Sequence, residues 1–332
     1  MFRRPSLALT LFLVAVFAVA LLLALLMNRE EEPPVARTQI AMGTMIEIQV
    51  RGLSRDRADA AITAAFAEVR RVDMLFSTYK THGPVWRLNH SRDTIIQVPD
   101  EVHALLRRCD TLWRASGGAF DAAIEPLVRA WGFDGETPAV PSAEALAAAR
   151  AHSGWAHVSI ADHRQIRKKP DAAVNFGAIA KGYAVDRAVA VLMRHGAHDA
   201  LVNAGGEIRA TGGDWQVGIQ HPRSPSEMLA VVELHGRAIA TSGDYEQYFV
   251  VDGSRYHHIF DPATGRPATR CQSVSVIADD DMTADAMATA VFVMGPERGM
   301  DFLTHSPDIE ALIVDADGMQ HSTPGFARYR MR

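Results

Sequence analysis

Asp285 and Thr289 are the two residues whose types and spacing most directly suggest chemistry. They lie four positions apart in the segment 282–290, which is rich in helix-forming residues, so both oxygen-bearing side chains would project from one helix face. A carboxylate above a hydroxyl could bind a hard cation such as Mg²⁺, which takes oxygen ligands and accompanies phosphate-bearing substrates. The structural alternative is that Thr289 bonds to its own helix backbone while Asp285 is solvated.

Five other short segments are richer in Gly, Asp and aromatic residues than packing requires. They span 117–121, 175–182, 203–207, 241–244 and 257–262. Small residues in the first would let a backbone approach a ligand, although a glycine helix cap followed by a turn is an equal alternative. In the second, glycines flank a lysine close to a helix start, where N–H groups attract anions, but the spacing of a Walker loop is missing. Individually, these motifs leave the ligand open.

The elements that must position these motifs are a mixture of helices and strands. The alternation of Ile46, Ile48 and Val50 with polar residues predicts a half-buried strand over 45–50. Helices are predicted after Ser54 and Pro99 and over 143–151 and 178–195, and strands over 200–203, 215–220, 230–234, 256–260 and 273–277. Because helices and strands are interspersed without a regular βαβ repeat, the sequence predicts an α+β fold.

Residues 1–28 are predicted to be a membrane anchor or an export signal. Arg3 and Arg4 precede an uncharged stretch from 7 to 27, which is long enough to cross a bilayer as a helix. A basic start followed by an apolar core is typical of an export signal, and a cleaved signal peptide is the alternative to a retained helix. We expect a linker over 29–37 and one domain over 38–332, held at the periplasmic face of the cytoplasmic membrane.

Composition narrows the class of protein further. A formal net charge of -5 and the lack of a basic stripe argue against a nucleic-acid partner. Cys109 and Cys271 are the only cysteines, and the sequence leaves open whether they are free or paired. The 14 histidines show no convincing spacing for a zinc site.

Taken together and in order, the motifs resemble the FAD:protein FMN transferase (ApbE) family. The matching segments are 42–44, 77–79 with 87–89, 118–121, 178–186, 203–207, 242–245, 258–262 and 284–290. The resemblance covers about residues 38 to 320, and its most specific parts are the Lys-Gly-Tyr segment at 181–183 and the Ala-Asp-Ala segment at 284–286. It implies an ApbE-like (T-fold-like) arrangement of mixed sheets with packed helices.

The resemblance also implies an activity. Members of the family are Mg²⁺-dependent enzymes that split FAD and transfer FMN to a threonine, or sometimes serine, hydroxyl of an acceptor protein, releasing AMP. The expected acceptors are flavoprotein subunits of sodium-pumping NADH:quinone reductases, Rnf-type complexes and related redox proteins. Two alternatives are a hydrolase that converts FAD to FMN and AMP, and a non-catalytic protein that binds FAD.

The resemblance implies three groups of site residues, each assigned by its position in the matching segments. The residues expected to contact FAD are Met42, Tyr79, Ala119, Phe120, Asp121, Asn175 and Lys181. The metal would be held by the carbonyl of Ala178 and the side chains of Asp285 and Thr289. His258 matches the candidate catalytic histidine and acts there with Asp285, although the base is open between His258 and an acid. Core packing is the alternative role for Tyr79 and Phe120, a structural hydrogen bond for His258, and adenosine positioning for Asp121.

Two departures from the family pattern stand out. Asn175 occupies a position where many relatives carry an aspartate, so an amide hydrogen bond would replace a charged contact. The N-terminal segment has no cysteine for lipid attachment, so an apolar helix would have to anchor the protein instead.

Overall fold

The computed structural model describes residues 33–135 and 137–331. The chain divides into a unit over Met1–Pro34 and a unit over Val35–Arg332, and the described helices and strands all lie in the second. The predicted anchor or signal segment, 1–28, and most of the predicted linker lie outside the described residues. Within the described part of the chain, no helix combines the length and apolar character needed to cross a bilayer.

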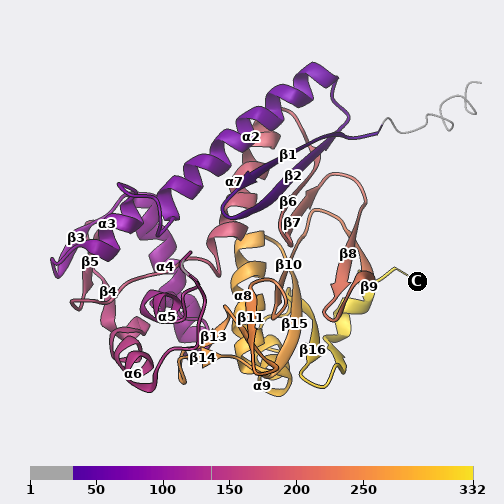
Figure 1. Cartoon of the computed structure of the whole chain (residues 1–332). Coiled ribbons are helices and arrows are strands. Elements are labelled where there is room, and N and C mark those ends of the chain that lie inside the picture. Colours follow the sequence, from indigo (N-terminus) through magenta and orange to yellow (C-terminus); the bar gives the residue numbers. More distant parts are fainter. Residues whose placement is uncertain (1–32, 136, 332) are drawn as a thin grey trace, which may run out of the picture. The chain divides into compact units, whose positions relative to one another are not determined.

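An antiparallel eight-stranded sheet forms the framework of the second unit (Figure 1). Its strands, in spatial order, are β1 (Val35–Ala41), β2 (Thr44–Arg51), β6 (Asp199–Ala204), β7 (Glu207–Thr211), β10 (Ala238–Gly243), β15 (Cys271–Ala278), β16 (Glu310–Asp315) and β17 (Gln320–Ser322). The strands predicted at 45–50, 200–203 and 273–277 are therefore confirmed as β2, β6 and β15. Those predicted at 215–220 and 230–234 are also confirmed, but they form a separate hairpin, β8 (Trp215–His221) with β9 (Ser224–Leu234).

Helices cover one face of this sheet. Ile46, Ile48 and Val50 of β2 are buried against α2 (Arg55–Phe76) and α7 (Ala180–Arg194), as their alternation predicts. Further along, α8 (Asp281–Met294) packs on β10 and β15, and its many alanines let it approach them closely. Figure 1 shows α2 and α7 over the end of the sheet that holds β1 and β2, and α8 over its middle.

The opposite face of the sheet carries a second apolar layer. Neighbouring residues of β15 point to opposite sides, so Val276 packs under the helices while Ile277 packs with Trp215 and Val217 of the β8–β9 hairpin. The short helix η2 (Pro324–Arg328) contributes Phe326 to the same layer. Two apolar layers, one on each face, fix the register of the central strands.

Most of the remaining elements form the part of the domain drawn in purple and magenta at the left of Figure 1, and the others are two short hairpins and a helix that directly follows α8. They are α3 (Pro84–His90), β3 (Ile95–Gln97), α4 (Asp100–Ala115), α5 (Glu125–Ala130), α6 (Ala143–His152), η1 (Trp155–His157), β4 (Val158–Ile160), β5 (Gln165–Lys168), β11 (Tyr248–Val251), β12 (Ser254–His257), β13 (Phe260–Asp261), β14 (Arg266–Pro267) and α9 (Pro296–Leu303). The predicted α+β class is confirmed.

The starts of the helices agree with the prediction only in part. Ser142 caps α6 by accepting a hydrogen bond from the N–H of Ala145, whereas Ser54 precedes α2 without a side-chain cap bond. The helix predicted over 178–195 begins two residues later, at Ala180. Cys109 and Cys271 are both buried and free, which answers the question of pairing.

The contact between α7 and α8 depends on the absence of a side chain at Gly182. A Cβ atom at this position would lie 2.3 Å from the carbonyl oxygen of Asp281. We therefore expect Gly182→Ala to lower the free energy of unfolding by about 1–3 kcal/mol, the usual cost of overpacking, as measured by urea denaturation. Met193→Ala, at an exposed position of the same helix, should stay within about 0.5 kcal/mol of the wild type. If Gly182→Ala were as stable as the wild type, α7 and α8 could move apart without a loss in the free energy of unfolding.

Candidate functional site

Carboxylates at the junction of α7 and α8 hold the start of α8 in place. Asp186 of α7 accepts hydrogen bonds from the backbone N–H groups of Asp281 (3.0 Å) and Met282 (2.9 Å). Asp280 caps α8 by accepting from the N–H of Thr283 at 2.8 Å. These bonds satisfy donors that the first turn of a helix leaves free. They fix the rotation of α8 and so decide where Asp285 points.

Asp285 points to the first turn of α7. Its Oδ2 atom accepts a hydrogen bond from the N–H of Gly182 at 3.0 Å, and the residue is only 4% exposed. Burial raises the pKa of Asp285 to about 6, although the charge of Lys181 and the Gly182 N–H oppose that rise. The structural alternative of a solvated Asp285 is therefore wrong, because the carboxylate is buried and bonded across two helices.

The kinds of donor atom predicted around Asp285 are those that an oxygen-ligated cation takes. The N–H of Gly182 lies in the first turn of α7, where a helix leaves its donors without an intrahelical acceptor, and Asp285 accepts from it. Ala178 precedes the N-cap residue Ile179, so its carbonyl lies outside the hydrogen-bond ladder of α7. One helical turn beyond Asp285, the hydroxyl of Thr289 lies 3.2 Å from the hydroxyl of Ser242 on β10. A carbonyl, a carboxylate and a hydroxyl make an all-oxygen set suited to Mg²⁺.

Lys181 brings a positive charge to the same place. Its Nζ atom lies 2.5 Å from Oε1 of Glu207, a buried carboxylate at the start of β7. Burial alone would lower the pKa of Lys181. The negative charges of Glu207 and Asp285 raise this pKa by more than burial lowers it, so the ammonium stays charged. Glu207 is the last residue of the predicted glycine turn at 203–207, in which the N–H of Gly206 donates to the side chain of Asn203. The lysine and glycine motifs therefore meet in space.

The two adjacent histidines have different roles. His257 is buried and uses both ring nitrogens, because Nε2 lies 2.7 Å from the Ala268 carbonyl and Nδ1 accepts from the N–H of Ile259. In His258, Nδ1 lies 3.3 Å from the carbonyl of Gln247, so Nδ1 must carry the proton and Nε2 the lone pair. Burial, helped by the charge of Lys181, lowers the pKa of His258 to about 4. His258 is thus a neutral imidazole with a free acceptor nitrogen.

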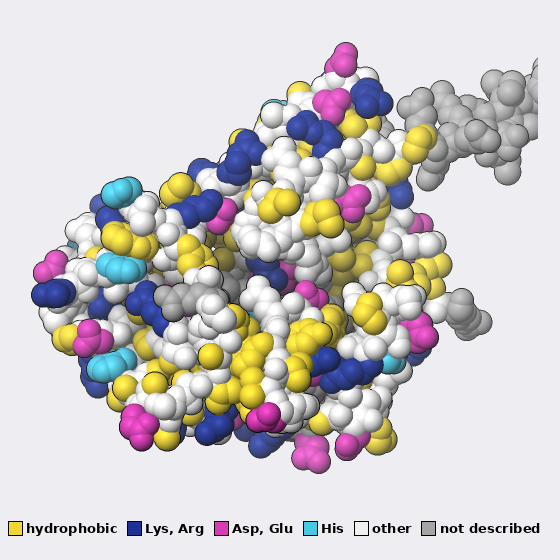
Figure 2. Space-filling model, viewed as in Figure 1, with side chains coloured by type: hydrophobic (Ala, Val, Ile, Leu, Met, Phe, Trp, Pro, Cys, Tyr) yellow, Lys and Arg dark blue, Asp and Glu magenta, His cyan; other side chains and the backbone are white. Residues whose placement is uncertain are grey.

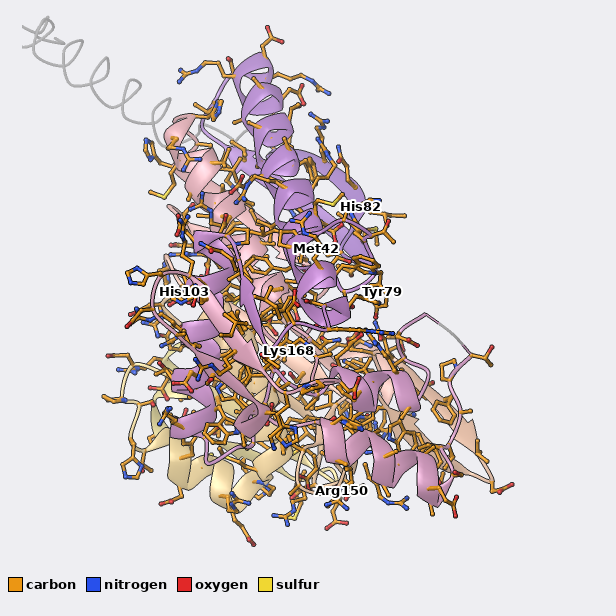
Figure 3. All side chains as sticks on the ribbon, turned by 90° about the vertical axis from the view of Figure 1, so that its left-hand side faces the viewer. Met42, Tyr79, His82, His103, Arg150 and Lys168 are labelled. Atoms are coloured by element: carbon orange, nitrogen blue, oxygen red, sulfur yellow. The ribbon has the colours of Figure 1, made fainter. Side chains whose placement is uncertain are left out.

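Met42 and Tyr79 flank the end of α2, and Figure 3 shows them on the same side of the domain. Met42 occupies the tight turn between β1 and β2 with a φ of 52°, and its N–H donates to Asp73 of α2 at 3.4 Å. Tyr79 is 56% exposed and donates its hydroxyl to the carbonyl of Phe133 at 3.4 Å. Core packing is therefore excluded for Tyr79, whose ring is free to stack on a ligand.

The segment after α4 is fixed by internal hydrogen bonds. The two carboxylate oxygens of Asp121 accept from the backbone N–H groups of Ala123 (2.7 Å) and Trp155 (2.8 Å). Phe120 is 1% exposed and its ring packs in the core, while Ala119 is also buried. Contact between this segment and FAD remains a prediction, and for Phe120 it would have to be made by the backbone.

Several residues that take part in this arrangement are absent from the predicted site, and Glu207, the partner of Lys181, is one of them. Asp186 and Gly182 join the two helices, and Glu125 of α5 accepts a hydrogen bond from the side chain of Asn175 at 2.7 Å. Asp186 and Gly182 lie within a matching segment, yet only the fold reveals their contacts with α8. Glu125 and Arg129 have the spacing of an ordinary exposed helix pair, so the sequence carries no signal that Glu125 is buried.

One cavity borders this cluster, while a second cavity and one acidic group lie apart from it. A cavity of about 330 Å³ includes Asn203 and Glu246 in its lining, and one of about 620 Å³ between α4, α8 and α9 includes Arg108 and Met287. Neither is lined by Asp285, Thr289, Lys181 or His258. Asp214, Glu233 and His235 form the one three-residue group of metal-binding type in the described ranges. This group belongs to the β8–β9 region, and His235 already bridges the two acids.

Comparison with known proteins agrees with the order of the motifs. The ApbE family model matches residues 42–313. Relatives called FAD:protein FMN transferase include those of Vibrio cholerae, 38% identical over 70% of this chain and 72% of that protein, and Treponema pallidum, 33% identical over 87% of each. A third, from Klebsiella pneumoniae, is 33% identical over 77% of each chain.

Solved structures agree as well. The ApbE protein of Thermotoga maritima superposes with a TM-score of 0.85 at 32% identity, covering 90% of this chain and all of that one. The flavin transferase ApbE from Vibrio cholerae gives a TM-score of 0.78 at 30% identity over 89% of this chain and 99% of its own. Sequence motifs, fold and site geometry lead to one conclusion: this chain is a member of the ApbE family.

Proposed function

We propose that this protein transfers FMN from FAD to a hydroxyl group of an acceptor protein. The observation that carries the proposal is the bond between Gly182 and Asp285, which places a buried carboxylate at the start of α7, beside Ala178 and Lys181. FAD contains a pyrophosphate, and a cation site next to a charged lysine suits that group. The names of the relatives from Vibrio, Treponema and Klebsiella support the same activity.

Ala178, Asp285 and Thr289 would hold Mg²⁺ through a carbonyl, a carboxylate and a hydroxyl oxygen. When bound, Mg²⁺ would polarise the pyrophosphate and offset negative charge on the leaving AMP. Lys181 would bind the same phosphates as a point charge. Its pairing with the buried carboxylate of Glu207 holds the ammonium in place before FAD arrives.

His258 is suited to accept the proton of the acceptor hydroxyl. A threonine hydroxyl is a weak nucleophile, and its oxygen would form a bond to the phosphorus of the FMN half while the bond to the AMP phosphate breaks. The proton would pass to Nε2 of His258, the nitrogen that carries a lone pair. The products are a phosphoester-linked flavin and AMP.

The acceptor would approach beside His258. The N–H of His258 donates to the Gln247 carbonyl, next to β11, in which Tyr248, Val250 and Val251 are exposed. Figure 2 shows hydrophobic side chains gathered over the region where Figure 1 places β11. An exposed apolar surface next to a site is typical of a contact with another protein.

The proposed acceptors are flavoprotein subunits of membrane redox complexes of the sodium-pumping NADH:quinone reductase or Rnf type. The proposed location is the periplasmic face of the cytoplasmic membrane, through the apolar segment at 7–27. Both proposals rest on the resemblance and on residues outside the described part of the chain.

The activity can be tested by incubating residues 35–332 with FAD, Mg²⁺ and a candidate acceptor. Mass spectrometry should find FMN attached to an acceptor threonine, and the adduct should disappear when EDTA is present. Rapid release of FMN and AMP without an adduct would instead identify a hydrolase. An unchanged, tightly bound FAD would identify a binding protein.

Asp285→Ala should abolish transfer, because it removes the one carboxylate of the proposed metal set. We expect the rate of AMP release to fall by at least about 100-fold, as when a group that stabilises transition-state charge is lost. Circular dichroism should show an unchanged fold. Asp301→Ala removes an exposed carboxylate of α9 and is the matched control. Normal turnover by Asp285→Ala would remove Asp285 from the metal site.

His258→Ala should lower kcat by about 10²–10⁴-fold with little change in KM for FAD, since general bases contribute that much. Because the pKa of His258 is lowered to about 4, its base form persists at neutral pH and is lost as the pH falls through that value. The wild-type rate should therefore be flat near neutrality and decline only in acid. His305→Ala, at an exposed histidine, is the control. Full activity in His258→Ala would assign the base to an acid.

A further inference from the structure

The side chain of Asn175 connects two parts of the domain that are distant in sequence. Its Nδ2 donates to Oε2 of Glu125 at 2.7 Å, and its Oδ1 accepts from the N–H of Gly177 at 2.7 Å. Its own N–H donates to the Ala122 carbonyl. Because the backbone N–H of Gly177 can only donate, the amide orientation is fixed and the NH₂ group must face Glu125.

Glu125 is an unusual residue to find in the interior. It lies in the first turn of α5 and its side chain is 2% exposed. Oε1 accepts from Nε of Arg129 at 3.0 Å, while Oε2 accepts from Asn175. Burial raises the pKa of Glu125, and the bonds from Asn175 and Arg129 oppose that rise. Burying a carboxylate is costly unless its oxygens are bonded, and here each oxygen has one partner.

The bond from Asn175 to Gly177 controls the loop that enters α7. Gly177 immediately precedes Ala178, whose carbonyl belongs to the proposed cation site, and Lys181 follows one turn later. A Cβ atom on Gly177 would lie 2.9 Å from Oδ1 of Asn175, so the loop is pressed closely against the amide. The chain of contacts from Arg129 through Glu125 and Asn175 to Gly177 thus ends next to the metal ligand.

We propose that Glu125 is a positioning residue of the flavin-transfer site, acting through Asn175 to fix the Ala178 carbonyl and Lys181. The inference rests on the proposed function of that site. Glu125 would touch neither FAD nor the reacting atoms. It sets the orientation of the Asn175 amide, and the amide sets the loop.

The proposal can be tested by exchanging the carboxylate and the amide between positions 125 and 175, because a donor at one position must face an acceptor at the other. Asn175→Asp places two carboxylates at the position of a 2.7 Å hydrogen bond with no donor between them, and like charges at that distance repel strongly. In the double variant Asn175→Asp/Glu125→Gln, the glutamine amide donates to the aspartate, whose other oxygen still accepts from Gly177. The net charge of the pair is also restored to its wild-type value.

The experiment measures kcat, KM for FAD and the half-saturating Mg²⁺ concentration for the wild type, both single variants and the double variant. We expect Asn175→Asp to lower kcat/KM by at least about 10-fold and to raise the Mg²⁺ requirement, within the coupling range of residues that share a hydrogen bond. Glu125→Gln keeps an acceptor for Asn175 and loses one ion pair, to an arginine whose side chain is 40% exposed. Its kcat/KM should therefore stay within about 3-fold of the wild-type value. The double variant should return to within about 3-fold of the wild type.

Two controls distinguish an effect on positioning from a loss of fold and from an effect of the added negative charge. Gln97→Glu adds the same charge at an exposed position of β3 and should leave all constants unchanged. Urea unfolding of every variant shows whether a loss of activity is a loss of fold; a change in Mg²⁺ requirement in a folded protein supports positioning. A double variant no better than Asn175→Asp, or Asn175→Asp equal to the wild type, would overturn the proposal. An inactive wild type would refute the proposed function instead, and FAD affinity would still report on the pair.

Discussion

The hydrogen bond between the N–H of Gly182 and the carboxylate of Asp285 is the interaction on which the rest of the site depends. It requires that α7 and α8 touch backbone to backbone, which a glycine at 182 permits. It also satisfies a donor that the first turn of α7 leaves free, and so places the carboxylate beside the segment that holds Ala178 and Lys181. The sheet beneath the helices, with apolar layers on both faces, supplies the rigidity that keeps these atoms in register.

Charge is distributed unevenly around this contact. Lys181 is paired with Glu207, Asp285 is buried beside them, and His258 is held neutral partly by the same lysine. Buried ion pairs are costly and contribute little to stability on average, so their concentration at one junction points to a role in binding and catalysis. The cation and phosphates that we propose would complete this set of charges.

Local patterns in the sequence predict local structure well here. The four-residue spacing of Asp285 and Thr289 does place both on α8, and the alternation in 45–50 does give a strand with one buried face. Long-range contacts could not be predicted in the same way, because Gly182 and Asp285 are 103 residues apart and Asn175 and Glu125 are 50 apart. The choice between His257 and His258 likewise needed the structure, since only hydrogen-bond partners distinguish two adjacent imidazoles.

The central claim, that Ala178, Asp285 and Thr289 form the cation site, can be tested by anomalous X-ray scattering from crystals grown with FAD and Mn²⁺ in place of Mg²⁺. We expect an anomalous peak about 2.1 Å from the Ala178 carbonyl oxygen, the Asp285 carboxylate and the Thr289 hydroxyl, the distance expected for a small divalent ion bound by oxygen. A peak only at the group formed by Asp214, Glu233 and His235, with none between α7 and α8, would contradict it.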